Sequence, residues 1–316
     1  MTSKRVAAID CGTNSIRLLV ADVDPESGAL ADLDRRMRIV RLGQGVDRTG
    51  RLAPEALERT FAACREYAEA IASYGVPLSP ERIRFVATSA SRDAENREDF
   101  VRGVREILSV EPQVITGEEE AQLSFTGATA ELHGPGGAGV PELPGPYLVF
   151  DLGGGSTEFV LGTDEVQAAR SVDIGCVRLT ERHGTDFAAI REDIAKALDE
   201  AAETVPLDAA TTLVGLAGTV TTVAGIALGL PAYDSERIHH ARIPLQQVRE
   251  VTERLLRSTH EERAAIPVIH PGRVDVITAG SLVLLSIMER TGAAELVASE
   301  HDILDGIAFS AARAAR

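Results

Sequence analysis

Residues 150–158 read Phe-Asp-Leu-Gly-Gly-Gly-Ser-Thr-Glu, which sets one carboxylate, Asp151, just before a run of residues without side chains. Apolar residues come before this run (147–150) and after it (159–161), a pattern typical of a β-hairpin with a glycine turn. Glycine permits positive φ and lets consecutive peptide N–H groups point into one concavity, which attracts phosphate oxygens. The stretch therefore predicts a hairpin turn that binds phosphate.

The N-terminal residues 9–15, Ile-Asp-Cys-Gly-Thr-Asn-Ser, repeat this arrangement, and an apolar run follows them too. The matching positions are Asp10, Gly12 and Ser15 in the first copy and Asp151, Gly153 and Ser156 in the second. A single Asp-x-Gly-x-x-Ser is more often a tight hairpin without a ligand. Two matched copies in one chain favour a pair of phosphate-binding turns.

Patterns typical of strands and helices alternate along the chain, which predicts an α/β protein. The clearest of them are helices at 54–74, 95–108, 118–131 and 303–314 and strands at 83–87 and 113–115. Glycine and proline dominate residues 132–146, which predicts a connecting loop.

Composition narrows the class of protein. The chain has 316 residues, 32 basic against 48 acidic, and a formal charge of −16. This charge opposes nucleic acid and anionic membranes as partners, so neither is expected. No signal-peptide pattern or membrane-spanning apolar run is present, and the three cysteines form no metal spacing, so we expect a cytoplasmic protein with reduced thiols.

The paired turns resemble the phosphate-1 and phosphate-2 loops of the actin, sugar kinase and Hsp70 superfamily. Within it, an ordered series of motifs is similar to that of the exopolyphosphatase and guanosine pentaphosphate phosphatase family, in a short two-domain form. The motifs lie at 10–17, 87–96, 115–123, 151–158, 215–222 and 299–306, and so cover essentially the whole chain.

The resemblance implies two ribonuclease H-like (actin-like ATPase) domains that flank an interdomain cleft. Domain I would comprise residues 1–130 and, through the returning final helix, 302–316; domain II would comprise 147–301, with 132–146 connecting them. The implied activity is hydrolysis of the terminal phosphoanhydride of inorganic polyphosphate. The alternative within the family is removal of the 5′ phosphate of guanosine pentaphosphate, and a homodimer is one option for the assembly.

Other classes use the same fold, namely ATP-binding kinases and non-catalytic sensor or filament proteins. No sugar-kinase acceptor motif is recognisable, whereas a binding protein could dispense with a catalytic glutamate altogether. Activity and its dependence on a glutamate therefore separate these classes.

Glu118, Glu119 and Glu120 begin a predicted helix, where acidic residues often only complement the helix dipole. Successive helical residues diverge by about 100°, so the three carboxylates cannot address one point. Matching the family motif to Gly117-Glu-Glu-Glu-Ala121 places the catalytic glutamate at Glu120.

The remaining candidates bind metal or phosphate. Asp151 is expected to act in catalysis with a bound Mg²⁺ or Mn²⁺, whose predicted ligands are Asp10, Asp151 and Glu158. Arg92 follows a buried strand at the end where α/β ligand sites form, and a guanidinium suits phosphate oxygens. The predicted phosphate-binding residues are Gly12, Thr13, Asn14, Ser15, Arg17, Arg92, Gly153, Gly154, Gly155, Ser156, Gly218 and Thr219.

Three segments within the family motifs can be interpreted in more than one way. Gly218 and Thr219 open a helix whose N–H groups suit phosphate or nucleotide, or they form a close-packed turn. Asn96 is either a helix cap or a site residue. His301-Asp302 looks like the dipeptide of HD phosphohydrolases, but the further ligands are missing, so Asp302 is expected to cap the last helix.

Overall fold

The computed structural model describes residues 3–24, 27–130 and 143–315, which form two compact units. Unit 1 comprises Met1–Ala130 and Ile303–Arg316, and unit 2 comprises Glu131–Asp302. Most of the predicted connecting loop, residues 132–142, lies outside the described residues.

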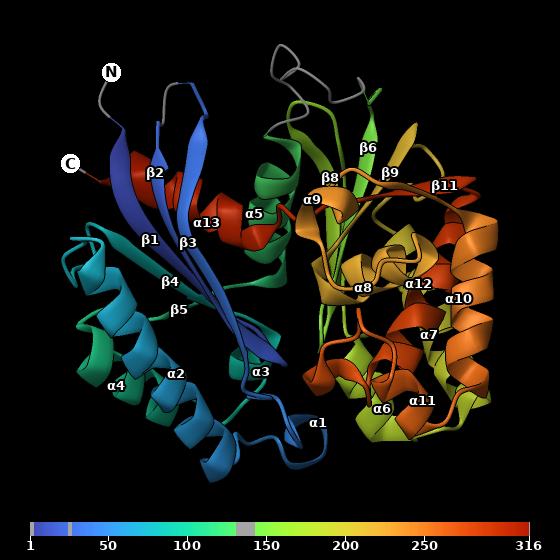
Figure 1. Cartoon of the computed structure of the whole chain (residues 1–316), viewed down its shortest axis with the longest axis horizontal. Coiled ribbons are helices and arrows are strands. Elements are labelled where there is room, and N and C mark those ends of the chain that lie inside the picture. Colours follow the sequence, from blue (N-terminus) through green and yellow to red (C-terminus); the bar gives the residue numbers. More distant parts are fainter. Residues whose placement is uncertain (1–2, 25–26, 131–142, 316) are drawn as a thin grey trace. The chain divides into compact units, whose positions relative to one another are not determined.

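Unit 1 contains a five-stranded sheet in the order β3-β2-β1-β4-β5 (Figure 1). Its first three strands form an antiparallel meander, whereas β4 runs parallel to β1 and β5 runs parallel to β4. The strands are β1 (Lys4–Cys11), β2 (Ser15–Val23), β3 (Leu30–Ile39), β4 (Ile83–Ala87) and β5 (Gln113–Val114).

Helices cover both faces of this sheet because its central strands are apolar on both sides. Alternate residues of β1 separate the two cores: Ile9 packs with residues of α2 and α4, and Ala8 packs with residues of α5 and α13. The helices of unit 1 are α1 (Val46–Thr49), α2 (Pro54–Ser73), α3 (Ser89–Arg92), α4 (Arg97–Leu108), α5 (Gly117–Thr129) and α13 (Ile303–Ala314).

Unit 2 contains a six-stranded sheet in the order β10-β11-β9-β6-β7-β8. Again three strands form an antiparallel meander, β9 runs parallel to β6, and β11 runs parallel to β9. The strands are β6 (Tyr147–Leu152), β7 (Thr157–Gly162), β8 (Val166–Val172), β9 (Thr212–Leu216), β10 (Arg242–Pro244) and β11 (Glu295–Ala298).

One core fills unit 2, where the stacked rings of Phe150 and Phe159 on the sheet join apolar residues of α7, α8, α10 and α12. The helices are α6 (Cys176–His183), α7 (Phe187–Ala202), α8 (Ala217–Ala227), α9 (Ser235–Ile238), α10 (Leu245–Arg257), α11 (His260–Ala264), the 3₁₀ helix η1 (Pro271–Arg273) and α12 (Ile277–Thr291). In the described part of the chain, no helix is long and apolar enough to cross a bilayer.

Five strands of each sheet share one topology: a meander, then two parallel strands added beside its first strand. Unit 2 adds β10 as an antiparallel edge strand beside β11. The repeated topology confirms the prediction of an α/β protein with a duplicated arrangement of strands. The helices predicted at 54–74, 118–131 and 303–314 are present with small shifts at their ends. The helix predicted from residue 95 begins at Arg97. Asn96 stands at its N-cap position, but its side chain bonds both backbone groups of Leu52 (2.8 and 3.1 Å) and does not cap the helix.

Candidate active site

The two predicted phosphate turns have the same backbone geometry. In the first turn, between β1 and β2, the Gly12 amide donates to the Ser15 carbonyl (3.0 Å). In the second turn, between β6 and β7, the Gly153 amide donates to the Ser156 carbonyl (3.1 Å). The duplication read in the sequence is therefore a structural repeat.

Contacts of the first turn hold it against the segment that follows β3. The Asn14 carbonyl accepts hydrogen bonds from the amides of Val40 and Arg41 (3.0 and 2.8 Å). The Thr13 hydroxyl lies 2.8 Å from that of Ser89, at the start of α3. The Asn14 Oδ1 atom is buried and has no hydrogen-bond partner among the described residues. This oxygen can accept a hydrogen bond from a ligand or coordinate a cation at the turn.

The carbonyl groups of the second turn accept hydrogen bonds from helix α6. The Gly153 carbonyl accepts from the Cys176 amide (3.1 Å), and the Gly154 carbonyl accepts from the amides of Val177 and Arg178 (2.9 and 3.0 Å). The Gly155 carbonyl accepts from Nε of Arg178 (2.7 Å).

This contact with α6 orients the amides of the turn. In a trans peptide unit the N–H points opposite to the carbonyl. Three successive N–H groups, those of Gly154, Gly155 and Ser156, therefore point away from α6. Such a set of N–H groups is a binding site for anionic oxygens.

Packing also requires a residue without a side chain opposite this turn. A Cβ at Gly175 would lie 2.4 Å from the carbonyl carbon and oxygen of Gly154, so only glycine lets α6 approach this closely. Arg178 was not among the residues predicted from the sequence to bind phosphate. The one sequence feature that could have indicated it is its position in the first turn of a helix, two residues after Cys176. Its contact with Gly155 makes it a part of the site.

Two acidic residues are paired beside the second turn. Asp151 and Glu158 are directly opposite in the β6–β7 register, and the two residues are 7% and 1% exposed. Residues paired in this way lie on one face of the sheet with their Cβ atoms about 5 Å apart. Ser171 on β8 donates to Oε1 of Glu158 (2.7 Å).

The equivalent position in the first turn pairs opposite charges. Asp10 is opposite Arg17 in the β1–β2 register, and Oδ2 of Asp10 accepts from Nε and Nη2 of Arg17 (2.9 and 2.7 Å). Arg17, a predicted phosphate ligand, thus binds the predicted metal ligand Asp10.

These oxygen donors fit Mg²⁺ or Mn²⁺. Like charges at opposite positions of a hairpin repel, and a bound cation relieves this repulsion. Within the described residues, no three His, Cys, Asp or Glu side chains come together as metal ligands. Mg²⁺ is commonly held by one or two carboxylates together with waters and substrate phosphates, so Asp151 and Glu158 suit it, whereas a closed cage of protein ligands is not formed.

Glu120 is the buried member of the three glutamates on α5. Its exposed fraction is 8%, whereas Glu118 and Glu119 are exposed. Arg92 at the end of α3 donates through Nη1 to Oε2 of Glu120 (3.2 Å) and to the Ile115 carbonyl (3.0 Å). The structure therefore brings together the predicted base and a predicted phosphate-binding arginine.

Gly218 and Thr219 lie in the first turn of α8, next to Arg273. A Cβ at Gly218 would lie 2.0 Å from Cζ of Arg273, and one at Gly280 would lie 2.6 Å from Oγ1 of Thr219. Because that guanidinium is the far end of a flexible side chain, it could move aside for a Cβ, and both interpretations of this segment, packed turn and phosphate site, stay predictions.

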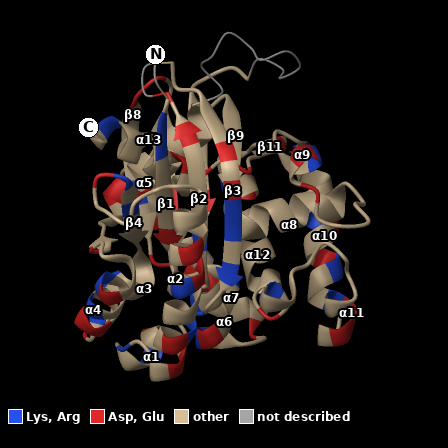
Figure 2. Cartoon of the chain, turned by 60° about the vertical axis from the view of Figure 1, so that its left-hand side comes forward, with Lys and Arg blue, Asp and Glu red and all other residues tan. Residues whose placement is uncertain are grey.

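The basic residues of β3 are paired with carboxylates. Figure 2 shows positive charge gathered along this strand of an acidic chain. Arg35 binds Asp305 and Asp32, and the other pairs are Arg36 with Asp34 (2.7 Å) and Arg38 with Glu66 (3.0 Å). The strand therefore presents compensated charge rather than an open cationic surface.

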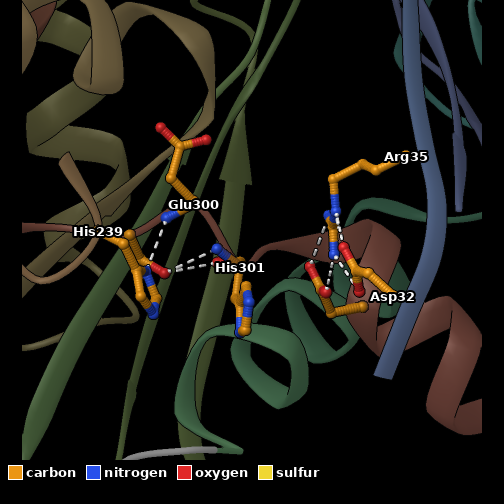
Figure 3. Close-up of polar contacts among 7 residues, drawn as sticks. Asp32, Arg35, His239, Glu300 and His301 are labelled. Atoms are coloured by element: carbon orange, nitrogen blue, oxygen red, sulfur yellow. Dashed lines mark hydrogen bonds and ion pairs between the residues drawn. The ribbon is translucent and has the colours of Figure 1, made fainter. Parts of the chain in front are cut away.

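His301, the residue discounted as a metal ligand, lies in a cluster of histidine rings in unit 2. Its ring is 4.6 Å from that of His239, which in turn stacks on His240 (3.7 Å). His239 accepts through Nδ1 from the Glu300 amide (3.2 Å), as Figure 3 shows. These contacts give the histidines a packing role.

Comparison with known proteins places the chain in a family. A model described as the Ppx/GppA phosphatase family matches residues 19–314. Exopolyphosphatase 2 of Mycobacterium tuberculosis is 49% identical over 99% of this chain and 100% of that protein. The crystal structure of an exopolyphosphatase-like protein shares 43% identity with a TM-score of 0.88, and covers 98% of this chain and 99% of its own.

The Ppx/GppA protein of Aquifex aeolicus also matches. Its crystal structure shares 30% identity with a TM-score of 0.78, and covers 97% of this chain and 96% of its own. The family model thus reaches into both units and includes the second turn, and the match to the Mycobacterium tuberculosis protein also covers the first turn. The chain belongs to the Ppx/GppA phosphatase family.

Proposed function

We propose that this chain is an exopolyphosphatase, which hydrolyses the terminal phosphoanhydride of inorganic polyphosphate and releases orthophosphate. The observation that carries the proposal is the second turn, where three amide N–H groups lie beside the paired acidic residues Asp151 and Glu158. Amides bind the anionic oxygens and carboxylates bind the cation that such a substrate requires. The name of the Mycobacterium tuberculosis relative supports polyphosphate as the substrate.

Each group has a role in this reaction. The N–H groups of Gly154, Gly155 and Ser156 hold the terminal phosphoryl oxygens. The first turn, which contains Asn14, binds phosphate in the same manner. Asp151 and Glu158 hold a divalent cation. Glu120 accepts the proton of the attacking water, and Arg92 keeps its carboxylate in place through the 3.2 Å contact.

A bound Mg²⁺ or Mn²⁺ would neutralise phosphate charge and polarise the phosphoryl oxygens. Because the chain carries a formal charge of −16, attraction of a polyanion has to be local. Screening over about 8 Å at physiological ionic strength lets the site act independently of acidic surface elsewhere. A cytoplasmic location and a homodimer stay predictions.

A phosphate-release assay tests the proposal. Purified protein is incubated with polyphosphate, guanosine pentaphosphate or ATP, with Mg²⁺ or with excess chelator. We expect orthophosphate from polyphosphate in Mg²⁺ alone, and little from Asp151→Asn, a close isostere that retains the fold. Asp208→Asn, at an exposed position of unit 2, is the matched control.

The other outcomes separate the alternatives. Faster release from guanosine pentaphosphate than from polyphosphate would assign the other activity of the family. Binding of ATP without phosphate release from any of the three compounds would contradict hydrolysis and favour a kinase or a sensor.

A further inference from the structure

Arg84 on β4 joins three other elements of unit 1 through its guanidinium group. Its Nη2 donates to Oε1 of Glu119 on α5 (2.6 Å), its Nη1 to Oγ of Ser310 on α13 (2.6 Å), and its Nε to Oε1 of Gln113 on β5 (3.0 Å). The Arg84 side chain is only 16% exposed. A guanidinium with every nitrogen engaged fixes the relative position of its partners.

The contact with Glu119 is made beside the predicted base. Glu119 and Glu120 are adjacent in the first turn of α5, so their side chains diverge by about 100° around the helix axis. Arg84 holds the first carboxylate and Arg92 holds the second. Two arginines on different elements therefore fix how far the first turn of α5 is rotated.

Helix α13 limits movement of α5 along its other side. A Cβ at Gly306 would lie 2.1 Å from the carbonyl oxygen of Leu123, so the two helices touch through their backbones. Leu123 is one turn beyond Glu120. Because Arg84 also binds Ser310 on α13, the same guanidinium couples both helices to the sheet.

We propose that Arg84 is a positioning residue, which through Glu119 sets the place of the Glu120 carboxylate. This inference rests on the proposed role of Glu120 as the base. Misplacing a reacting group by about 1 Å can cost on the order of 100-fold in rate. Loss of one of the two arginine contacts allows a smaller movement, so an effect of about tenfold is expected.

The test is a double-mutant cycle on phosphate release from polyphosphate, together with melting temperatures. Arg84→Met keeps an unbranched apolar side chain and removes the three guanidinium nitrogens that donate these hydrogen bonds. It should lower kcat about tenfold and leave KM within about twofold, because Arg84 acts on the base and not on the substrate. In the Glu120→Gln background the same change should cost no further activity.

Three variants control for other effects. Arg38→Met removes an arginine that pairs with Glu66 in the same unit and should leave kcat unchanged. Ser310→Ala removes the contact with α13 but keeps the one with Glu119, and should also leave kcat unchanged. Arg84→Lys retains one charged donor, and its kcat should lie between those of Arg84→Met and the unaltered protein.

A lower melting temperature with unaltered kcat in Arg84→Met would overturn the inference and leave Arg84 a structural residue. An equal loss of kcat on Arg84→Met in the normal and in the Glu120→Gln background would also overturn it. If Arg84→Met does not fold, Glu119→Gln decides, with a loss of about threefold expected in the normal background and none in the Glu120→Gln background. Full activity of Glu120→Gln would instead refute the proposed base, and this inference with it.

Discussion

Asp151 faces Glu158 across one hairpin at the register position where Asp10 faces Arg17 across the other. The two turns are alike in backbone geometry and opposite in the charge set beside the aspartate. In unit 1 the aspartate is neutralised by an arginine at 2.7 Å. In unit 2 the register sets two buried acidic residues opposite each other, and like charges at opposite positions are stabilised when a cation binds between them.

The first prediction follows from that pair of carboxylates. Glu158→Gln removes one of two like charges, so in excess chelator the variant should melt above the unaltered protein. Added Mg²⁺ should raise the melting temperature of the unaltered protein and have little effect on the variant. Scanning calorimetry measures both effects, with Asp208→Asn as control. Equal Mg²⁺ responses in all three proteins would exclude Glu158 as a metal ligand.

The second prediction separates the three glutamates of α5. General-base assistance is worth about 10²–10⁴-fold, so Glu120→Gln should lower kcat by that order and preserve substrate binding. Glu118→Gln and Glu119→Gln should cost far less, because both side chains are exposed, whereas Glu120 is buried and paired with Arg92. Steady-state kinetics decide between them. A severe loss in Glu119→Gln with normal activity in Glu120→Gln would show that the match to the family motif is off by one residue.

The third prediction concerns stability of unit 1. Arg35 binds Asp305, which is 1% exposed, at 2.5 Å and Asp32, which is 41% exposed, at 2.7 Å (Figure 3). Burial lowers the pKa of Arg35, but the ion pairs with Asp305 and Asp32 outweigh this and raise it. Asp305→Ala leaves the arginine without its buried partner and should cost about 3 kcal/mol.

Asp32→Ala is the matched control for this change, because it removes the exposed partner of the same guanidinium. It should cost less than about 1 kcal/mol. Urea titrations of the two variants supply both free energies of unfolding. Equal losses would mean that burial of the Asp305 pair contributes nothing to stability.

Much of this architecture could be predicted from the sequence, because its signals are local. The repeated Asp-x-Gly pattern predicted both hairpins, and Pro54 and Gly75 marked the ends of α2. The contacts that complete the candidate site could not be predicted, because they join residues far apart in the chain. Arg84 meets Ser310 across 226 positions, and only the fold shows it.

Asp305 illustrates the same limit. It lies in the first turn of α13, where an acidic side chain complements the helix N-terminus. Its carboxylate instead binds Arg35 on β3, 270 positions earlier. A short-range rule placed the residue correctly, and a tertiary contact determined its partner.

The fourth prediction is a pH dependence of stability. Burial, and to a lesser extent the charge of Asp302, raises the pKa of Glu300 above 4.5, and the hydrogen bond from Tyr233 (2.6 Å) offsets this only in part. A raised pKa in the folded state favours the protonated acid, so its contribution is complete below pH 4.5 and is lost as pH rises through the folded pKa.

Glu300→Gln keeps an oxygen for the Tyr233 hydroxyl and cannot ionise. It should therefore melt above the unaltered protein at neutral and alkaline pH, and this advantage should shrink towards acidic pH. Melting curves across that range test the sign, with the exposed Glu236→Gln as control. An advantage that is the same at every pH would contradict the account of Glu300.

Phosphorus NMR of polyphosphate of defined length, incubated with the protein and Mg²⁺, tests the central claim most directly. Terminal hydrolysis shortens each chain by one unit at a time, so the orthophosphate signal should grow and the internal signal should fall while the number of chain ends stays constant. Excess chelator or Glu120→Gln should stop both changes. A rising number of chain ends would show internal cleavage, and an unchanged spectrum would show no hydrolysis; either result would contradict the claim that this chain removes terminal phosphate from polyphosphate.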